Sequence, residues 1–355
     1  MPTHLLARLG TTAAAATSCL ALAAAGPATA VAPAPPGAPD VAARAAANPL
    51  DAGPLGVYRG DADGIYPAYA KADGRKKRLL AKVALQPRVR WLGQWIPTKQ
   101  VKGKVRSHIE GVQAGDRDVI VPMAVFRLWP RTEAAKHEPL RTKDRRAYRR
   151  WVDRAAAGIG SARVVMVLEP DLPVALTGWR PGVRLKLARY AARTFGALPR
   201  TTVYLDGSDS DWLTPERSAW MLRKAGIAHV RGFALGATHY APLPDAIRYA
   251  DQVADRLAAA GLPGKHAVID TADNAHGFTW SQYWDAHPRG DFDNAETCRD
   301  RAERRCVTLG VPPTTDVDSS DTVDAYLWFG RPWLHRQASP FKMKRALQIA
   351  RTTPY

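Results

Sequence analysis

Cysteine is scarce in this chain, with three in 355 residues. Cys19 falls in an apolar N-terminal stretch that is typical of a secretory signal. The other two, Cys298 and Cys306, lie eight positions apart in a predicted loop. In an oxidising compartment this pair most simply forms one local disulfide. So few thiols, with no His/Cys cluster to complete a ligand set, argue against a structural metal site.

The signature motifs of several reaction classes are missing as well. The sequence contains no G-x-G-x-x-G run and no P-loop, so nucleotide chemistry has little support. It contains no G-x-S-x-G elbow, which argues against a serine nucleophile. The histidines at 239, 266 and 276 share no helical spacing of the kind that metal-binding pairs show. We therefore expect no cofactor and no metal.

Long apolar runs are absent, because the one candidate, residues 13–25, is too short to span a bilayer. Arg8 precedes this run and an Ala-Thr-Ala cleavage site (28–30) follows it, which predicts a signal peptide over residues 1–30 and a secreted, extracellular protein. Residues 31–47 are rich in proline and alanine and should form an extended linker. Residues 48–355 are predicted to form the catalytic domain.

Acidic residues are outnumbered by basic ones, 33 to 51, which leaves a formal net charge of +18. Much of the excess lies in RKKR (75–78) and RTKDRRAYRR (141–150). No recognisable nucleic-acid-binding module accompanies these runs, so nucleic acid is not a predicted partner. Solvated helix faces are the first interpretation of such runs. A weak attraction to anionic cell-wall polymers is the second.

Short apolar segments alternate with amphipathic helical patterns, which predicts parallel strands joined by crossover helices. The expected strands are Val89–Leu92, Val119–Phe126, Val164–Leu168, Thr202–Leu205, Arg231–Leu235, Ala267–Ile269 and Ala325–Phe329. The expected helices include Arg145–Ile159, Pro181–Phe195, one from Pro215 to Gly226, Asp245–Ala260 and Pro340–Arg351. Such a chain can form an open doubly wound sheet or a closed barrel. Acids at several strand ends favour an α/β barrel.

Three of the expected strands lead into carboxylates. VVMVLEPD (164–171) runs from five apolar residues into Glu169 and Asp171, VYLD (203–206) ends in Asp206, and AVID (267–270) ends in Asp270. Ionised carboxylates are costly at the end of a buried strand unless they face a cleft. Without metal ligands or a Ser-His pair, they suggest general acid/base work on a polar, uncharged substrate. Glycoside hydrolysis fits this best.

Aromatic and acidic residues in the predicted loops support a sugar substrate. Indole faces stack on the apolar faces of sugar rings, which makes Trp95, Trp212 and Trp328 candidates for substrate binding, although core packing explains any single one equally well. Asp209 and Asp211, in GSDSDW, resemble a metal-binding acidic loop. Turn chemistry explains them equally well.

Taken together, the motifs resemble glycoside hydrolase family 6, the inverting β-1,4-glucanases and cellobiohydrolases of secreted bacterial and fungal systems. The resemblance covers about residues 48–333 and follows the family's order: NPL (48–50), VLEPD (167–171), VYLDGSDSDW (203–212), GFAL (232–235), KHAVIDTADN (265–274), LGVPPTT (309–315) and DAYLW (324–328). It implies a distorted barrel of seven parallel strands that acts on a β-glucan such as cellulose. By motif, Asp171 matches the general acid, Asp206 and Asp270 match site aspartates, and Trp212 matches a sugar-stacking aromatic.

Departures from the family pattern bear on the mechanism. Glu133 stands where the family has an Asp that tunes the acid and supports the water, so it is our candidate for that role. After DAYLW the family continues V-K-x-P-G-E-S-D-G, whereas this chain reads FGRPWLHR (329–336) and lacks the Lys, Glu and Asp, including the usual base. In the family's GFALN-S-N motif, His239 replaces the last Asn.

Three hypotheses follow. The first is an active inverting glucanase, expected as a monomer, in which Asp171 protonates the leaving oxygen. The second is a family member that binds polysaccharide or cell-wall glycan without hydrolysis. The third is an enzyme with an altered substrate and a shifted base, such as Glu138, Asp209 or Asp291.

Overall fold

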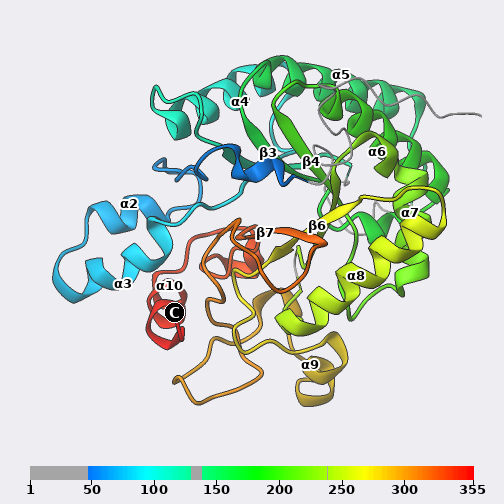
Figure 1. Cartoon of the computed structure of the whole chain (residues 1–355). Helices are drawn as coiled ribbons and strands as arrows, with labels where there is room; N and C mark the ends of the chain where they lie inside the picture. The colour runs from blue at the N-terminus through cyan, green and yellow to red at the C-terminus, as the bar shows by residue number, and fades with distance from the viewer. Residues whose placement is uncertain (1–46, 129–137, 238) are drawn as a thin grey trace, which may run out of the picture. The chain divides into compact units, whose positions relative to one another are not determined.

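A computed structural model describes residues 47–128, 138–237 and 239–355, and in these residues seven parallel strands form one sheet (Figure 1). The strands lie side by side in chain order, each hydrogen-bonded to the next. They are β1 (Arg90–Gly93), β2 (Val121–Phe126), β3 (Val164–Leu168), β4 (Thr201–Asp206), β5 (Gly232–Leu235), β6 (His266–Asp270) and β7 (Val323–Leu327).

The sheet curls until its first and last strands meet at one point. Arg88 and Trp328 form an isolated parallel bridge, and the Val89 amide donates to the Trp328 carbonyl at 2.8 Å. Helices follow most of the strands, so the fold is a barrel-like α/β sheet. The predicted distorted seven-stranded β/α barrel is confirmed.

Both faces of the sheet are buried, which explains why the strands are apolar throughout. Side chains alternate between the faces. In β3, Val164 and Met166 pack with the outer core beneath the helices, whereas Val165 and Val167 pack inside the curl. The same alternation directs Tyr204 of β4 and Val268 of β6 inward.

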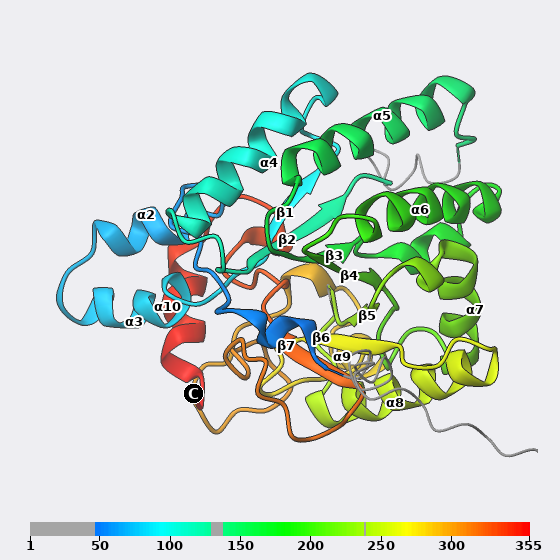
Figure 2. The same ribbon diagram turned by 45° about the horizontal axis from the view of Figure 1, so that its top comes forward.

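Five helices cover the outer face of the sheet (Figure 2). They are α4 (Thr98–Gln113), α5 (Thr142–Ile159), α6 (Pro181–Gly196), α7 (Pro215–Ala225) and α8 (Leu243–Ala259). The predicted caps of α7 are present, since Thr214 Oγ1 accepts from the Arg217 amide at 3.3 Å and Gly226 has a left-handed conformation. None of the helices in the described ranges has the length and apolarity that a membrane crossing requires.

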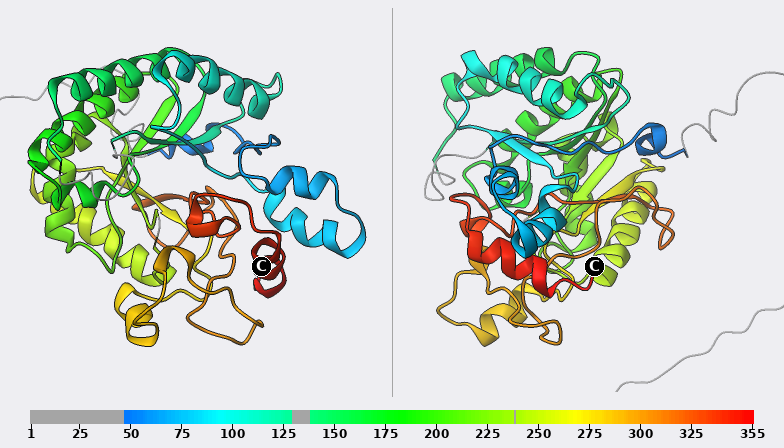
Figure 3. Two further views of the ribbon diagram at one scale, coloured as in Figure 1. Left: turned by 180° about the vertical axis from the view of Figure 1, so that it is seen from behind. Right: turned by 90° about the vertical axis from the view of Figure 1, so that its left-hand side faces the viewer.

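Three further helices lie at one side of the sheet: α2 (Ile65–Ala70), α3 (Gly74–Ala84) and α10 (Met343–Thr352) (Figure 3). Helices α3 and α10 are neighbours, and Lys82 Nζ donates to the Tyr355 carbonyl at 2.8 Å. The last helix, predicted at roughly Pro340–Arg351, is present but begins at Met343. Pro340 instead accepts from the His335 amide in a small antiparallel contact. The basic runs lie on α3 and α5, mostly exposed.

Candidate active site

The inward-facing acids lie at the carboxyl ends of β4 and β6, two strands that are separated only by β5. Asp206 and Asp270 are the last residues of β4 and β6, so each strand extends one residue beyond its expected end. Asp206 is two residues from Tyr204, and Asp270 is two from Val268. Alternation therefore places both carboxyls on the inner face of the curl. Both are 2 % exposed.

Asp171 lies beside Asp206 in a tight turn after β3. Its amide donates to Asp206 Oδ2 at 2.9 Å. Asp171 and Glu169 both have left-handed backbone conformations, with φ of 64° and 54°. Non-glycine residues adopt this region rarely, and such strain persists where the surrounding structure enforces it. The turn thus holds Asp171 at the strand end.

The buried side chain of Glu169 holds this turn in place. Its Oε1 accepts from Tyr148 Oη at 2.6 Å, and its Oε2 accepts from the amides of Leu128 and Arg127 at 2.8 and 3.0 Å. Burial outweighs these donors and raises the pKa of Glu169 to about 7. Tyr148 lies on α5 and Leu128 follows β2, so Glu169 ties the turn to two neighbouring elements.

The carboxyls of Asp206 and Asp209 have raised pKa values. Burial raises the pKa of Asp206 well above its ordinary value, and the charge of Asp171 adds to this, against hydrogen bonds from the Ser208 and Asp171 amides. Burial also raises the pKa of Asp209 to about 6, partly offset by His239. Carboxyls with raised pKa values at one end of a cleft are typical of acid/base sites.

Asp270 anchors the loop that follows β7. Its Oδ1 accepts from the amides of Ala272 and Phe329 at 2.9 and 3.2 Å, and its Oδ2 accepts from the Gly330 amide. Burial raises its pKa to about 8 in spite of these donors. The carboxyl is committed to backbone amides, which suits a positioning role better than direct sugar binding.

The predicted tryptophans differ in exposure. Trp95 is 55 % exposed and Trp212 is 37 % exposed, so both offer indole surface to a ligand. Trp328 is only 2 % exposed, packs in a hydrophobic cluster and donates from Nε1 to the Val311 carbonyl at 2.8 Å. The expectation of a sugar-binding role for Trp328 is therefore corrected to core packing, because its faces are covered.

The family model for glycosyl hydrolases family 6 matches residues 57–333. The chain belongs to this family. Endoglucanase A of Cellulomonas fimi is 30 % identical over 269 residues, covering 75 % of this chain and 53 % of the relative. Endoglucanase 1 of Streptomyces sp. (strain KSM-9) is 30 % identical over 266 residues, covering 73 % and 67 %. The chain thus spans about half the length of the first of these relatives.

Solved structures of the family agree with the fold. The endoglucanase Cel6 from Mycobacterium tuberculosis, in complex with a thio-linked cellobioside, superimposes with a TM-score of 0.71 at 27 % identity, over 85 % of this chain and 98 % of that one. Endoglucanase CEL6B from Humicola insolens gives a TM-score of 0.67 at 19 % identity, over 86 % and 98 %, which supports the fold alone.

The remaining predictions concern the disulfide and the candidate acids Glu133, Asp291 and Asp209. The Cys298–Cys306 disulfide is present, as predicted. Glu133 lies outside the described residues, as do the predicted signal peptide and nearly all of the linker. Asp291 pairs with Arg336, whose Nε donates at 2.7 Å. Asp209 Oδ1 accepts from the Ser210 amide at 2.5 Å, which agrees with the interpretation of GSDSDW (207–212) as a turn.

Some residues of the site were not anticipated from sequence. The Arg331 guanidinium lies 4.2 Å from the ring centroid of Trp91, and Trp91 Nε1 donates to the Phe329 carbonyl at 2.8 Å. Burial lowers the pKa of Arg331 to about 10, opposed by the charges of Asp63, Asp171 and Asp270. A cation therefore lies in the loop that has lost the family's Lys, one position beyond the place of that Lys.

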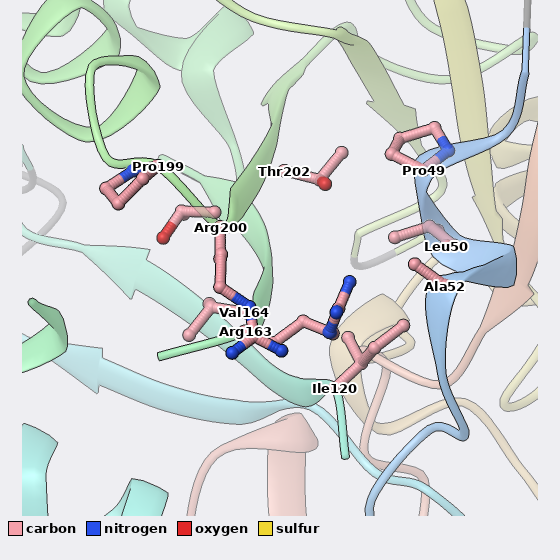
Figure 4. A pocket seen from close by; sticks show the side chains of 10 residues that line it. Pro49, Leu50, Ala52, Ile120, Arg163, Val164, Pro199, Arg200 and Thr202 are labelled. Carbon is pink, nitrogen blue, oxygen red and sulfur yellow. The ribbon is translucent and has the colours of Figure 1, made fainter. Parts of the chain in front are cut away.

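A pocket at the opposite end of the sheet is separate from these acids. It lies at the amino ends of β3 and β4, and Figure 4 shows its lining, including Leu50, Ile120 and Thr202. Arg163 and Arg200 also line it and pair with Asp118 at 3.4 and 2.7 Å. In barrels of this kind the reaction takes place at the carboxyl ends of the strands, so this pocket is not the candidate active site.

Proposed function

We propose that this family 6 chain is a secreted glycosidase that hydrolyses β-1,4-linked glucan, such as cellulose, with inversion. Asp171 donates the proton to the leaving oxygen. Glu133 tunes this acid and supports the attacking water. Trp212 and Trp95 offer stacking surfaces to sugar rings, and Asp206 and Asp270 position the groups around the acid.

One observation carries the proposal: Asp171 is held in a left-handed turn against the buried carboxyl of Asp206. Inverting hydrolysis needs one protonated carboxyl at the leaving oxygen and a second group that activates water. The names of the endoglucanase relatives support a glucan substrate for this chain.

A second candidate function is polysaccharide binding without hydrolysis. The segment after DAYLW favours it, because FGRPWLHR (329–336) lacks the Lys, Glu and Asp of the family's motif, including the usual base. Calorimetric binding of cello-oligosaccharides without any release of reducing ends would support this candidate.

The decisive experiment compares wild type with Asp171→Asn. On a soluble β-glucan, the variant should lose about 10²–10⁴-fold in kcat, the usual contribution of a general acid. In a dinitrophenyl β-cellobioside, the dinitrophenolate group leaves without being protonated. The variant should therefore retain much more of its rate on that substrate. NMR of the first products from the wild type should show the α-anomer.

The matched control is Asp255→Asn, which removes an exposed carboxyl on α8. It should hydrolyse both substrates at the wild-type rate. Equal activity of Asp171→Asn and wild type on the glucan would refute the assignment of the acid. A β-anomeric first product would refute inversion.

A further inference from the structure

His239 forms a fixed pair with Asp211 at the end of the sheet where the site acids lie. His239 Nδ1 lies 2.7 Å from Asp211 Oδ1. A carboxylate can only accept, so Nδ1 carries the hydrogen and Nε2 is the free acceptor of the neutral ring. Asp211 is itself held, because its Oδ2 accepts from the Trp280 amide at 2.5 Å. Both side chains are at least nine-tenths buried.

Three aromatic rings fix the orientation of the imidazole. The Trp212 ring stacks on it with centroids 4.9 Å apart and planes 10° apart. Trp280 stacks less closely, at 5.9 Å and 21°, and Phe292 meets it edge-on at 5.3 Å. Rotation about the side-chain bonds is therefore blocked, so Nε2 keeps one direction.

The Nε2 atom remains available for a proton. In the described part of the chain it has no hydrogen-bond partner, and it is not among the fully enclosed polar atoms that lack one. His239 keeps 9 % of its surface exposed. A water molecule or a substrate hydroxyl can therefore reach Nε2 through this exposed part of the ring.

The groups around the imidazole are the acids of the site. His239 interacts electrostatically with Asp171, Asp206, Asp209 and Asp293, in addition to its partner Asp211. Burial lowers its pKa, but the hydrogen bond and charge of Asp211, followed by the charges of Asp209 and Asp171, outweigh this and raise it above the ordinary value. His239 thus belongs to the same electrostatic cluster as the proposed acid.

We propose that the Asp211–His239 pair accepts the proton of the attacking water in the hydrolysis proposed above, in place of the acids lost after DAYLW. This inference rests on the proposed function. The water oxygen forms a bond to C1 while the bond from C1 to the leaving oxygen breaks. The leaving oxygen takes the proton of Asp171, and Nε2 takes a proton from the water. Solvent then returns both groups to their starting states.

The alternative bases are less suited. Asp291 is paired with Arg336. Asp209 Oδ1 accepts from the Ser210 amide and hydroxyl, which leaves one oxygen for chemistry. An imidazole that a carboxylate orients through Nδ1 is the arrangement that other hydrolases use to take a proton from a nucleophile.

The experiment measures kcat and KM on a soluble β-glucan for wild type, His239→Ala, Asp211→Asn and Asp209→Asn. His239→Ala should lower kcat by about 10²–10⁴-fold with a small change in KM. Added imidazole should restore part of its rate. Because the neutral ring is the active form, activity rises with pH through the pKa of His239. Asp211→Asn removes the charge that raises the pKa of His239, so the rise in activity should occur at lower pH.

His287→Ala is the matched control, since that exposed ring contacts Tyr283 away from the pair. It should show wild-type rates and no response to imidazole. Nitrogen NMR of the histidine rings, which needs no activity, should show His239 protonated at Nδ1 and free at Nε2 at alkaline pH. Circular dichroism checks that each variant is folded.

The outcomes separate the two proposals. An active wild type whose His239→Ala variant keeps its rate and pH profile would overturn the role of the pair alone. So would a loss confined to Asp209→Asn, or a ring protonated at Nε2 instead of Nδ1. A wild type that releases no product would overturn the proposed function, and the role of the pair with it.

Discussion

Glu169 illustrates how a single carboxyl can organise the site without meeting the substrate. It is wholly buried and satisfied by three donors, from α5 and from the segment after β2. Two residues later the chain presents Asp171. Because a lost partner would leave a buried acid unsatisfied, the turn has little freedom to move. The price of this rigidity is a carboxyl whose pKa is raised to about 7.

Replacing Glu169 with Gln should therefore flatten the pH dependence of stability. In the unfolded chain, the glutamate pKa is about 4.3. In the folded protein Glu169 keeps its proton until about pH 7. The stability that Glu169 contributes is therefore complete below the pKa of the unfolded chain, and it is lost as the pH rises through about 7. The difference between these two pKa values corresponds to about 4 kcal/mol. Urea unfolding on both sides of this window measures it. Glu110→Gln, on the exposed side of α4, should behave as wild type. Equal pH dependence in Glu169→Gln and wild type would contradict the prediction.

At the scale of elements, the approach of β5 to β6 sets the spacing of the site. Gly232 of β5 pairs with His266 of β6, and a Cβ on Gly232 would lie 1.6 Å from the His266 carbonyl oxygen. Only glycine permits this approach. The two strands lead to His239 and Asp270, so any separation would spread the site.

Gly232→Ala should destabilise the protein by about 1–3 kcal/mol, the usual range for overpacking. Gly111→Ala is the matched control. Gly111 lies in α4 with nothing within 4 Å of an added Cβ, so the change should stabilise by about 0.5–1 kcal/mol. Thermal unfolding of the two variants should give shifts of opposite sign. A Gly232→Ala variant as stable as wild type would show that the strands can separate freely.

The strands and their terminal acids were predictable because they depend on local patterns. Val164 to Leu168 are apolar on both faces, and Asp206 and Asp270 follow by alternation. The His239–Asp211 pair was not predictable, since it joins loops after β4 and β5 and depends on how those strands are spaced. The burial of Trp328 was missed for a related reason: its cover comes from distant segments, including the Val311 carbonyl. The sequence shows that His239 replaces the family's Asn, but it does not show that Asp211 is the partner of His239.

At the scale of the whole molecule, Arg88 holds the curled sheet together where β1 and β7 meet. It is 2 % exposed and donates to Asp63 Oδ2 at 2.9 Å. It also donates to four carbonyls, those of Tyr58, Val83, Ala84 and Gln86, at 2.5 to 3.1 Å. One side chain thus links the N-terminal segment, the end of α3 and the seam of the sheet.

Arg88→Met should lower the free energy of unfolding by about 3–5 kcal/mol, because it leaves Asp63 and several buried carbonyls without a partner. Arg200→Met provides the comparison, since Arg200 pairs with Asp118 at the surface, where solvent screens the charges. Its loss should be far smaller. Urea unfolding of both variants measures the difference, and hydrogen exchange should show the β1 and β7 amides exposed first in Arg88→Met. Similar losses in the two variants would show that the seam is held by the hydrophobic core and not by Arg88.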